Sequence, residues 1–133
     1  MIIKEITKQD YDTALKIYNE CFIRNINAIK LPILGILIGL YKDDNLIGII
    51  QIDYLNNIME NKQQAIINNF CIKKEYQNKG YGTYFLNEII TYLKEKNINH
   101  ITLTSNKNRV FAHKIYKKND FSIIDTIILN KDL

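Results

Sequence analysis

The residues best suited to chemistry lie at Gln77–Gly82, which read Gln-Asn-Lys-Gly-Tyr-Gly. An apolar, β-prone run precedes them, and apolar residues at helical spacing follow them. Gly80 and Gly82 carry no Cβ, so the backbone is able to turn sharply and to be approached closely. The first N–H groups of a helix lack intrahelical acceptors, and the helix dipole and Lys79 add positive charge. The stretch therefore predicts a strand-to-helix turn that binds an anionic group, most simply a pyrophosphate.

The glycine spacing separates this stretch from two common nucleotide-binding loops. A dinucleotide-binding turn reads Gly-x-Gly-x-x-Gly, and a P-loop reads Gly-x-x-x-x-Gly-Lys-Ser/Thr. The chain has Gln-x-x-Gly-x-Gly, which resembles the Arg/Gln-x-x-Gly-x-Gly/Ala loop of the GNAT N-acetyltransferases. The longer run Phe70–Gly82 resembles that family's fourth strand and pyrophosphate loop. The resemblance implies that coenzyme A is bound by Gln77, Asn78, Lys79, Gly80, Tyr81, Gly82 and Thr83.

A second signature, Arg109–Phe121, resembles the late helix of the same family. Many members read Arg-x-x-Ala-His-x-x-Tyr-Glu-x-x-Gly-Phe, and the chain matches at Arg109, Ala112, His113, Tyr116 and Phe121. Asp120 replaces the glycine, so we expect the turn after the helix to differ. The resemblance places Tyr116 beside the coenzyme sulfur, and a hydroxyl with a pKa of about 10 is protonated at neutral pH. Tyr116 is therefore the candidate general acid for the leaving thiolate, and the alternative is a packing aromatic.

Other candidate site residues surround these two signatures. The resemblance implies a backbone N–H at or next to Ile72, flanked by Cys71, that binds the acetyl carbonyl. Cys71 itself has no evident partner that would make it a nucleophile. Arg109 either contacts a coenzyme phosphate or caps the loop before its helix, and His113 either assists proton transfer or packs. The general base stays open between Asp53, Glu60, Glu75, and a water chain held by Asn68, Asn69 or Thr104.

The bulk composition restricts the class of protein. A chain of 133 residues suits one domain, residues 1–133, and 47% hydrophobic residues with a mean hydropathy of −0.18 suit a soluble globular protein. The net charge is +4, but the lysines are scattered and predict a solvated surface rather than a specific nucleic-acid site. The two cysteines have no metal-ligand spacing, so we expect no metal. With no signal-peptide pattern and no apolar run of about 20 residues, we expect a cytoplasmic protein that does not enter a membrane.

The hydrophobic periodicities predict an α/β (α+β) domain. Its sheet is mixed and mostly antiparallel, with about six to seven strands and about four flanking helices. We expect strands at Ile2–Ile6, Ile36–Lys42, Leu46–Leu55, Ala65–Lys73, His100–Thr104, Phe121–Asp125 and Thr126–Lys131. We expect helices from Thr7 or Asp10 to Phe22, within Arg24–Pro32, and at Gly80–Lys96 and Arg109–Lys118, with Asn56–Gln64 as a loop. The resemblance further implies that the two central parallel strands splay apart.

Two functions of different classes follow. The first is a GNAT-like acyltransferase that moves an acetyl group from acetyl-CoA to a small-molecule or peptide amine by direct attack in a ternary complex. The second is a non-catalytic acyl-CoA-binding regulatory module, which would keep Gln77–Thr83 but would not need Tyr116. Nucleic-acid binding rests on the net charge alone. The chain is expected to be a monomer or a homodimer, because its edge strands are able to pair between subunits.

Overall fold

The computed structural model describes residues 1–31 and 33–133. Its strands are β1 (Ile2–Glu5), β2 (Ile36–Lys42), β3 (Asn45–Asn57), β4 (Lys62–Ile72) and β5 (His100–Leu103). Its α-helices are α1 (Tyr11–Phe22), α2 (Tyr81–Glu95) and α3 (Val110–Lys118), and two short 3-10 turns, η1 (Lys8–Asp10) and η2 (Lys74–Tyr76), precede α1 and α2. The five strands form one sheet in sequence order, antiparallel from β1 to β4 and parallel between β4 and β5.

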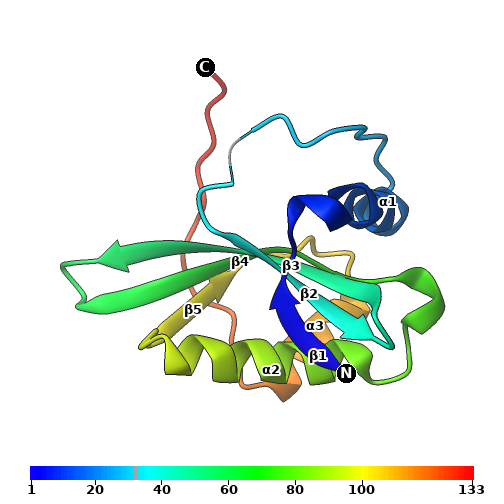
Figure 1. The fold of residues 1–133 in the computed structure, drawn as a ribbon. Coiled ribbons are helices and arrows are strands. Elements are labelled where there is room, and N and C mark those ends of the chain that lie inside the picture. Colours follow the sequence, from blue (N-terminus) through cyan, green and yellow to red (C-terminus); the bar gives the residue numbers. More distant parts are fainter. Residues whose placement is uncertain (32) are drawn as a thin grey trace.

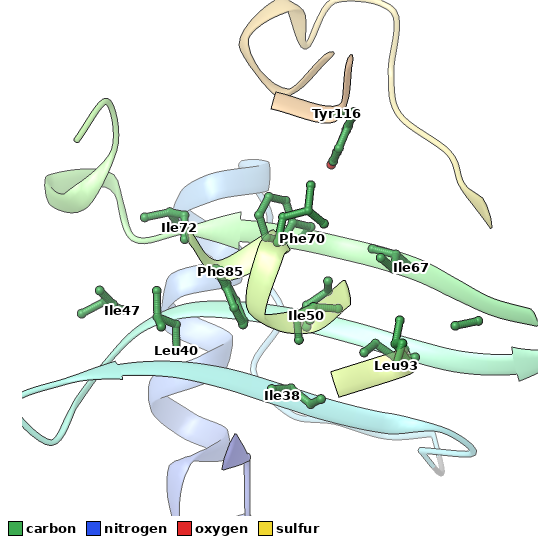
Figure 2. Packing of buried hydrophobic residues seen from close by; sticks show 14 residues of the cluster. Ile38, Leu40, Ile47, Ile50, Ile67, Phe70, Ile72, Phe85, Leu93 and Tyr116 are labelled. Carbon is green, nitrogen blue, oxygen red and sulfur yellow. The ribbon is translucent and has the colours of Figure 1, made fainter. Parts of the chain in front are cut away.

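The sheet lies between two helical layers (Figure 1). Helix α1 covers one face, and α2 and α3 lie on the other. Helix α2 buries the stripe of apolar side chains that its periodicity predicts, with Phe85, Leu86 and Ile89 0% exposed. These side chains pack against the sheet residues drawn in Figure 2, among them Ile50 and Ile67. The loop before α2 is thereby anchored to the largest core of the protein.

Strand β4 contains a bulge that changes which side chains face α2. Asn69 has φ of 51°, and the β3–β4 register shifts between Ile49 and Gln51. Before the bulge, the side chain of Ile67 enters the α2 core, and after it those of Phe70 and Ile72 do so. A bulge adds one residue to one strand, bends it and increases its twist. Asparagine tolerates the left-handed conformation that this bend requires.

The parallel strands β4 and β5 separate close to this bulge. The register runs from Gln64 opposite His100 to Ile67 opposite Leu103, and β5 ends there, whereas β4 continues to Ile72. The second half of β4, after the bulge, therefore has an edge that β5 does not cover. This is the divergence of the central parallel strands that the resemblance implied.

Two segments that precede the Gln77–Gly82 turn in the chain differ from the sequence-based expectation. No helix forms within residues 24–31, where the side-chain amide of Asn19 instead bonds both the N–H and the carbonyl of Ile26. Pro32, on which part of that expectation rested, lies outside the described residues. The expected loop Asn56–Gln64 is mostly strand, since pairing continues to Asn57 opposite Lys62 around a turn at 58–61. Cross-strand pairing outweighed polar composition there.

The C-terminal segment also departs from expectation. The strands expected at Phe121–Asp125 and Thr126–Lys131 do not form, and Ile123, Ile127 and Leu129 are exposed. A strand requires a ladder partner, and none pairs with this segment among the described residues. The described sheet accordingly has five strands rather than six to seven, and three α-helices rather than four, with the mixed α/β class unchanged.

None of the helices in residues 1–31 and 33–133 has the length and apolar character needed to cross a membrane.

Candidate active site

The strand-to-helix turn forms where the sequence predicts it. Gly80 is the N-cap of α2 with φ of 88°, and Asn78 before it has φ of 62°. The first backbone bond of the helix runs from the Tyr84 N–H to the Gly80 carbonyl at 3.1 Å, and no side chain caps the helix. The N–H groups from Lys79 to Thr83 have no acceptor among the described residues. The turn thus presents several unpaired donors at the positive end of a helix.

The side chains around the turn keep it open and fixed. Asn78, Lys79 and Gly80 are exposed, so the amides face solvent. The ring of Tyr81 packs edge-on against Tyr76 with their centroids 5.8 Å apart. A Cβ on Gly82 would lie 3.1 Å from Ile115 Cδ1, tighter than most real contacts, so this glycine permits the close approach of α2 and α3.

Gln77 closes the turn rather than extending over it. Its Nε2 donates to the carbonyl oxygen of Ile72 at 2.8 Å. This bond ties the loop to the end of β4. In the structure the Gln77 side chain therefore closes the turn.

The end of β4 directs polar backbone groups toward the strand divergence. The Lys73 N–H donates to the Ile47 carbonyl at 2.7 Å, so Lys73 faces β3. Successive residues of a strand turn their N–H and C=O groups to opposite edges, so those of Ile72 point to the edge beyond the last β4–β5 pair. The Ile72 carbonyl accepts from Gln77 and from the Cys21 Sγ at 3.2 Å. The Ile72 N–H therefore points into the divergence.

Tyr116 lies in the core beside β4. It is 7% exposed, and its ring centroid is 6.2 Å from that of Phe70. Figure 2 shows its hydroxyl oxygen at the end of the side chain nearest to Phe70. Burial raises the pKa of the Tyr116 hydroxyl above its ordinary value, and the nearby Arg109 guanidinium opposes that rise. The hydroxyl is therefore a proton donor throughout the neutral range.

The turn after α3 holds Tyr116 in place despite the replaced glycine. Asp120 adopts φ of 66°, the conformation that a glycine would take. The Phe121 N–H donates to the Tyr116 carbonyl at 3.1 Å and the Asp120 N–H to the Lys117 carbonyl at 3.2 Å, which together form a Schellman motif. The rings of Tyr116 and Phe121 lie 5.9 Å apart. The expected change in this turn does not occur.

Arg109 and Cys71 belong to a group between α3, α1 and β4. The Arg109 guanidinium lies 4.9 Å from the ring centroid of Phe22 at the end of α1. Hydrogen bonding with Cys21 and burial raise the pKa of the Cys71 thiol far above its usual range. A thiol must be deprotonated to be a nucleophile, so this environment argues against that role for Cys71.

The candidate bases differ in their surroundings. Glu60 pairs with Lys62 at 2.9 Å, and Glu75 pairs with Lys73 at 2.8 Å, both at exposed positions. Thr104 is exposed beyond the end of β5. Asp53 is half-buried and accepts from the side-chain amides of Gln51 and Asn68.

The helix α3 histidine has a partner of its own. The Nε2 of His113 lies 3.1 Å from the Ser105 Oγ in the loop after β5. This contact joins α3 to that loop and fits the packing role better than a role in proton transfer. Asn108, also in the loop, bonds locally through its N–H to Asn106 Oδ1 at 2.9 Å.

Sequence reasoning missed two residues of this region. Gln51 bonds both Asp53 and Asn69, and the alternation of polar residues in an otherwise apolar strand was the signal that marks it. The Tyr18 hydroxyl is buried beside Cys71 and has no hydrogen-bond partner among the described residues. The sequence gives no signal of this, because Tyr18 belongs to the apolar stripe of its helix.

Two surface hollows lie elsewhere. One of ≈ 240 Å³ and one of ≈ 480 Å³ share Tyr92 in their linings. Tyr92 is at the far end of α2, about 17 Å from the turn at its N-terminus. Neither hollow is lined by a residue of the turn, by a residue of the strand divergence, or by a candidate acid or base. The candidate site therefore consists of the open turn and the strand divergence.

The fold is an α/β domain in which a strand–loop–helix turn with unpaired N–H groups lies beside diverging parallel strands. The profile of the Acetyltransferase (GNAT) family matches residues 3–121. The chain therefore belongs to the GNAT acetyltransferase family. No curated protein matches the sequence.

Solved structures share this fold at low sequence identity. A transcriptional regulator from Bacillus halodurans C-125 has 18% identity and a TM-score of 0.83 over 99% of both chains. An aminoglycoside acetyltransferase from an uncultured soil metagenomic sample, in complex with sisomicin, has 11% identity and a TM-score of 0.81 over 99% of this chain and 95% of its own. A predicted acetyltransferase with acetyl-CoA from Clostridium acetobutylicum has 19% identity and a TM-score of 0.73 over 97% of this chain and 95% of its own.

Proposed function

We propose that the protein transfers an acetyl group from acetyl-CoA to a primary amine, by direct attack of the amine in a ternary complex. The observation that carries this proposal is the row of unpaired N–H groups at the start of α2, next to a strand whose parallel neighbour has ended. A diphosphate suits the first feature and a thioester arm suits the second. Membership of the GNAT family supports the same assignment.

The residues of the turn would hold the diphosphate. The N–H groups from Lys79 to Thr83 donate to phosphate oxygens, and the Lys79 ammonium adds charge. Gln77, Asn78 and Tyr81 flank these donors. Arg109, whose guanidinium lies over the Phe22 ring, is a second cation and would donate to a coenzyme phosphate.

The end of β4 and α3 would act on the thioester. The Ile72 N–H, with Cys71 beside it, donates to the acetyl carbonyl and stabilises the negative charge that develops there. The Tyr116 hydroxyl protonates the departing thiolate, whose conjugate thiol has an ordinary pKa of about 8.5. The raised pKa of Tyr116 keeps that proton in place at neutral pH. The amine attacks directly, since Cys71 is held as a buried thiol.

The test is release of free thiol from acetyl-CoA by the purified protein with a panel of primary amines, alongside calorimetric titration with CoA. We expect CoA binding and amine-dependent thiol release, with one acetylated amine formed per thiol. The Bacillus halodurans neighbour, described as a transcriptional regulator, favours a second candidate, the non-catalytic acyl-CoA-binding module. CoA binding with no thiol release for any amine would support that candidate, and absence of CoA binding would refute both.

A further inference from the structure

The two cysteines of the chain meet under the end of α1. The bulge at Asn69 directs the side chains of Phe70 and Ile72 to the α2 core. Strand alternation therefore turns Cys71, which lies between them, toward α1. Cys71 is 3% exposed in the cluster buried under α1, and Cys21, in the last turn of that helix, packs against the same cluster. A thiol from a helix and a thiol from a central strand are thereby brought together.

The two thiols differ in acidity and in access. Hydrogen bonding with Cys71 lowers the pKa of the Cys21 thiol, although burial opposes the fall, and the positive charge of Arg109 favours the thiolate. Hydrogen bonding with Cys21 and burial raise the pKa of the Cys71 thiol. Cys21 is half-buried at the end of α1, where residues 23–31 are exposed, and its Sγ lies 3.2 Å from the Ile72 carbonyl oxygen. Cys21 is therefore the accessible and more reactive thiol of the two.

A buried hydroxyl lies beside this pair. The Tyr18 hydroxyl, on the turn of α1 before Cys21, has no hydrogen-bond partner in the part of the chain that the structure describes. Burial, with smaller effects from Cys71 and Cys21, raises the pKa of this hydroxyl, so it stays protonated and remains a donor. A buried donor with no acceptor is unfavourable. A sulfur that carries negative charge during thiol–disulfide exchange would supply the missing acceptor.

We propose that Cys21 and Cys71 form a redox pair, which small-molecule disulfides oxidise to a disulfide bridge between α1 and β4. The Cys21 sulfur attacks one sulfur of the small disulfide, whose S–S bond breaks. The other sulfur leaves as a thiol with the proton that Cys21 gave up. The Cys71 sulfur then attacks the Cys21 sulfur and releases the second small thiol, which takes the Cys71 proton. Two protein thiols are oxidised, and one small disulfide is reduced to two thiols.

The bridge would alter the candidate site, an effect that rests on the proposed acetyl transfer. The sulfurs of a disulfide are about 2.05 Å apart, closer than thiols in hydrogen-bond contact, so the ends of α1 and β4 would be drawn together. The Cys21 Sγ would also stop donating to the Ile72 carbonyl. Because Ile72 follows Cys71 directly, its N–H would leave the position proposed for binding the acetyl carbonyl. The oxidised protein should therefore transfer acetyl groups more slowly.

The experiment treats the reduced protein with oxidised glutathione, quenches it in acid, unfolds it and alkylates the remaining thiols with N-ethylmaleimide before mass spectrometry. The chain has two cysteines, so each state has its own mass. We expect the wild type to lose two hydrogens and to take up no alkyl group, and dithiothreitol to reverse this. Cys71→Ala should keep one glutathione on Cys21, because the second thiol is missing. Cys21→Ala, whose remaining thiol is buried, should take up one alkyl group and no glutathione.

Other masses contradict the redox pair. A wild type that is alkylated twice, that keeps a bound glutathione, or that forms disulfides between chains would overturn the proposal. Should the alanine variants fail to fold, proteolysis of the oxidised wild type decides. A peptide that joins Cys21 to Cys71 within one chain supports the proposal, and its absence refutes it.

The effect on the site is measured as thiol release from acetyl-CoA, after glutathione has been removed. We expect the oxidised wild type to have a kcat/KM at least tenfold below that of the reduced wild type, and dithiothreitol to restore it. Cys21→Ala is the matched control, since oxidant should leave its activity equal to that of its own untreated form. A bridged protein with full activity overturns the effect on the site while the redox pair stands. A bridged protein with no thiol release in either form overturns the proposed acetyl transfer and leaves the redox pair supported by its mass.

Discussion

The sharpest prediction concerns Gly80, where conformation and ligand contact can be separated by two substitutions. Gly80 has φ of 88°, and a Cβ built there meets nothing within 4 Å. Alanine would therefore fit sterically in the free protein but would be forced into a left-handed conformation that costs about 1–2 kcal/mol. Asparagine tolerates that region, as Asn61, Asn69, Asn78 and Asn97 of this chain do. Gly80→Asn should therefore fold with a smaller loss of stability than Gly80→Ala.

The two Gly80 substitutions should affect CoA affinity differently from the free energy of unfolding. Either new side chain would project into the open space above the first amides of α2, where the diphosphate is proposed to bind. We expect both variants to weaken CoA binding at least tenfold, which corresponds to about 1.4 kcal/mol. Only Gly80→Ala should also lower the free energy of unfolding by the full conformational cost. The two losses then have two separate physical causes.

The measurements are urea-induced unfolding and calorimetric titration with CoA. Asn97→Ala is the matched control, since Asn97 has φ of 63° at the other end of α2 and its substitution should cost stability without affecting CoA. A Gly80→Asn protein that binds CoA as tightly as the wild type would refute the anion-binding turn. A Gly80→Ala protein as stable as the wild type would refute the left-handed conformation.

Three further predictions address the rest of the site. Tyr116→Phe should lower kcat for thiol release about 100-fold or more with CoA affinity unchanged, and normal turnover, compared with the remote control Tyr92→Phe, would remove the hydroxyl from the mechanism. Asp120→Gly should raise the free energy of unfolding by about 0.5–1 kcal/mol, because it relieves a positive φ and removes a negative charge from a helix C-terminus; a loss of stability in urea would contradict this. Burial raises the pKa values of Tyr18 and Tyr116, so the unfolded chain loses these protons first as pH rises above about 10. The contribution of these two tyrosines to the free energy of unfolding should therefore be constant below about pH 10 and fall above it. Equal urea midpoints at pH 8 and pH 11 would count against the burial of the two hydroxyls.

The elements that local periodicity specifies were predicted well. The strand Ile36–Lys42 has the expected bounds, and the helix expected at Gly80–Lys96 forms at Tyr81–Glu95. The turn between β4 and α2 was predicted for the same reason, because its glycines, its lysine and the change from strand to helix periodicity lie within a few residues of one another.

Elements that depend on a distant partner were predicted poorly. The β3–β4 hairpin extends through the polar residues to Asn57 and Lys62 because each strand completes the other's ladder. The isoleucines after Phe121 suggest strands, yet no strand forms there. Pairing partners are chosen over long sequence separations, so the composition of a segment alone does not decide them.

The sequence by itself determined the strand-to-helix turn at Gln77–Gly82, the helix behind it and the helix that carries Tyr116, because each depends on residues adjacent along the chain. Only the tertiary structure decided that Asn69 would form a bulge, that β5 would leave β4 at Ile67, and that Asp53 would accept from the side-chain amides of Gln51 and Asn68. The physical reason is register: a bulge and a strand divergence exist only relative to the neighbouring strands, and those strands come from other parts of the chain.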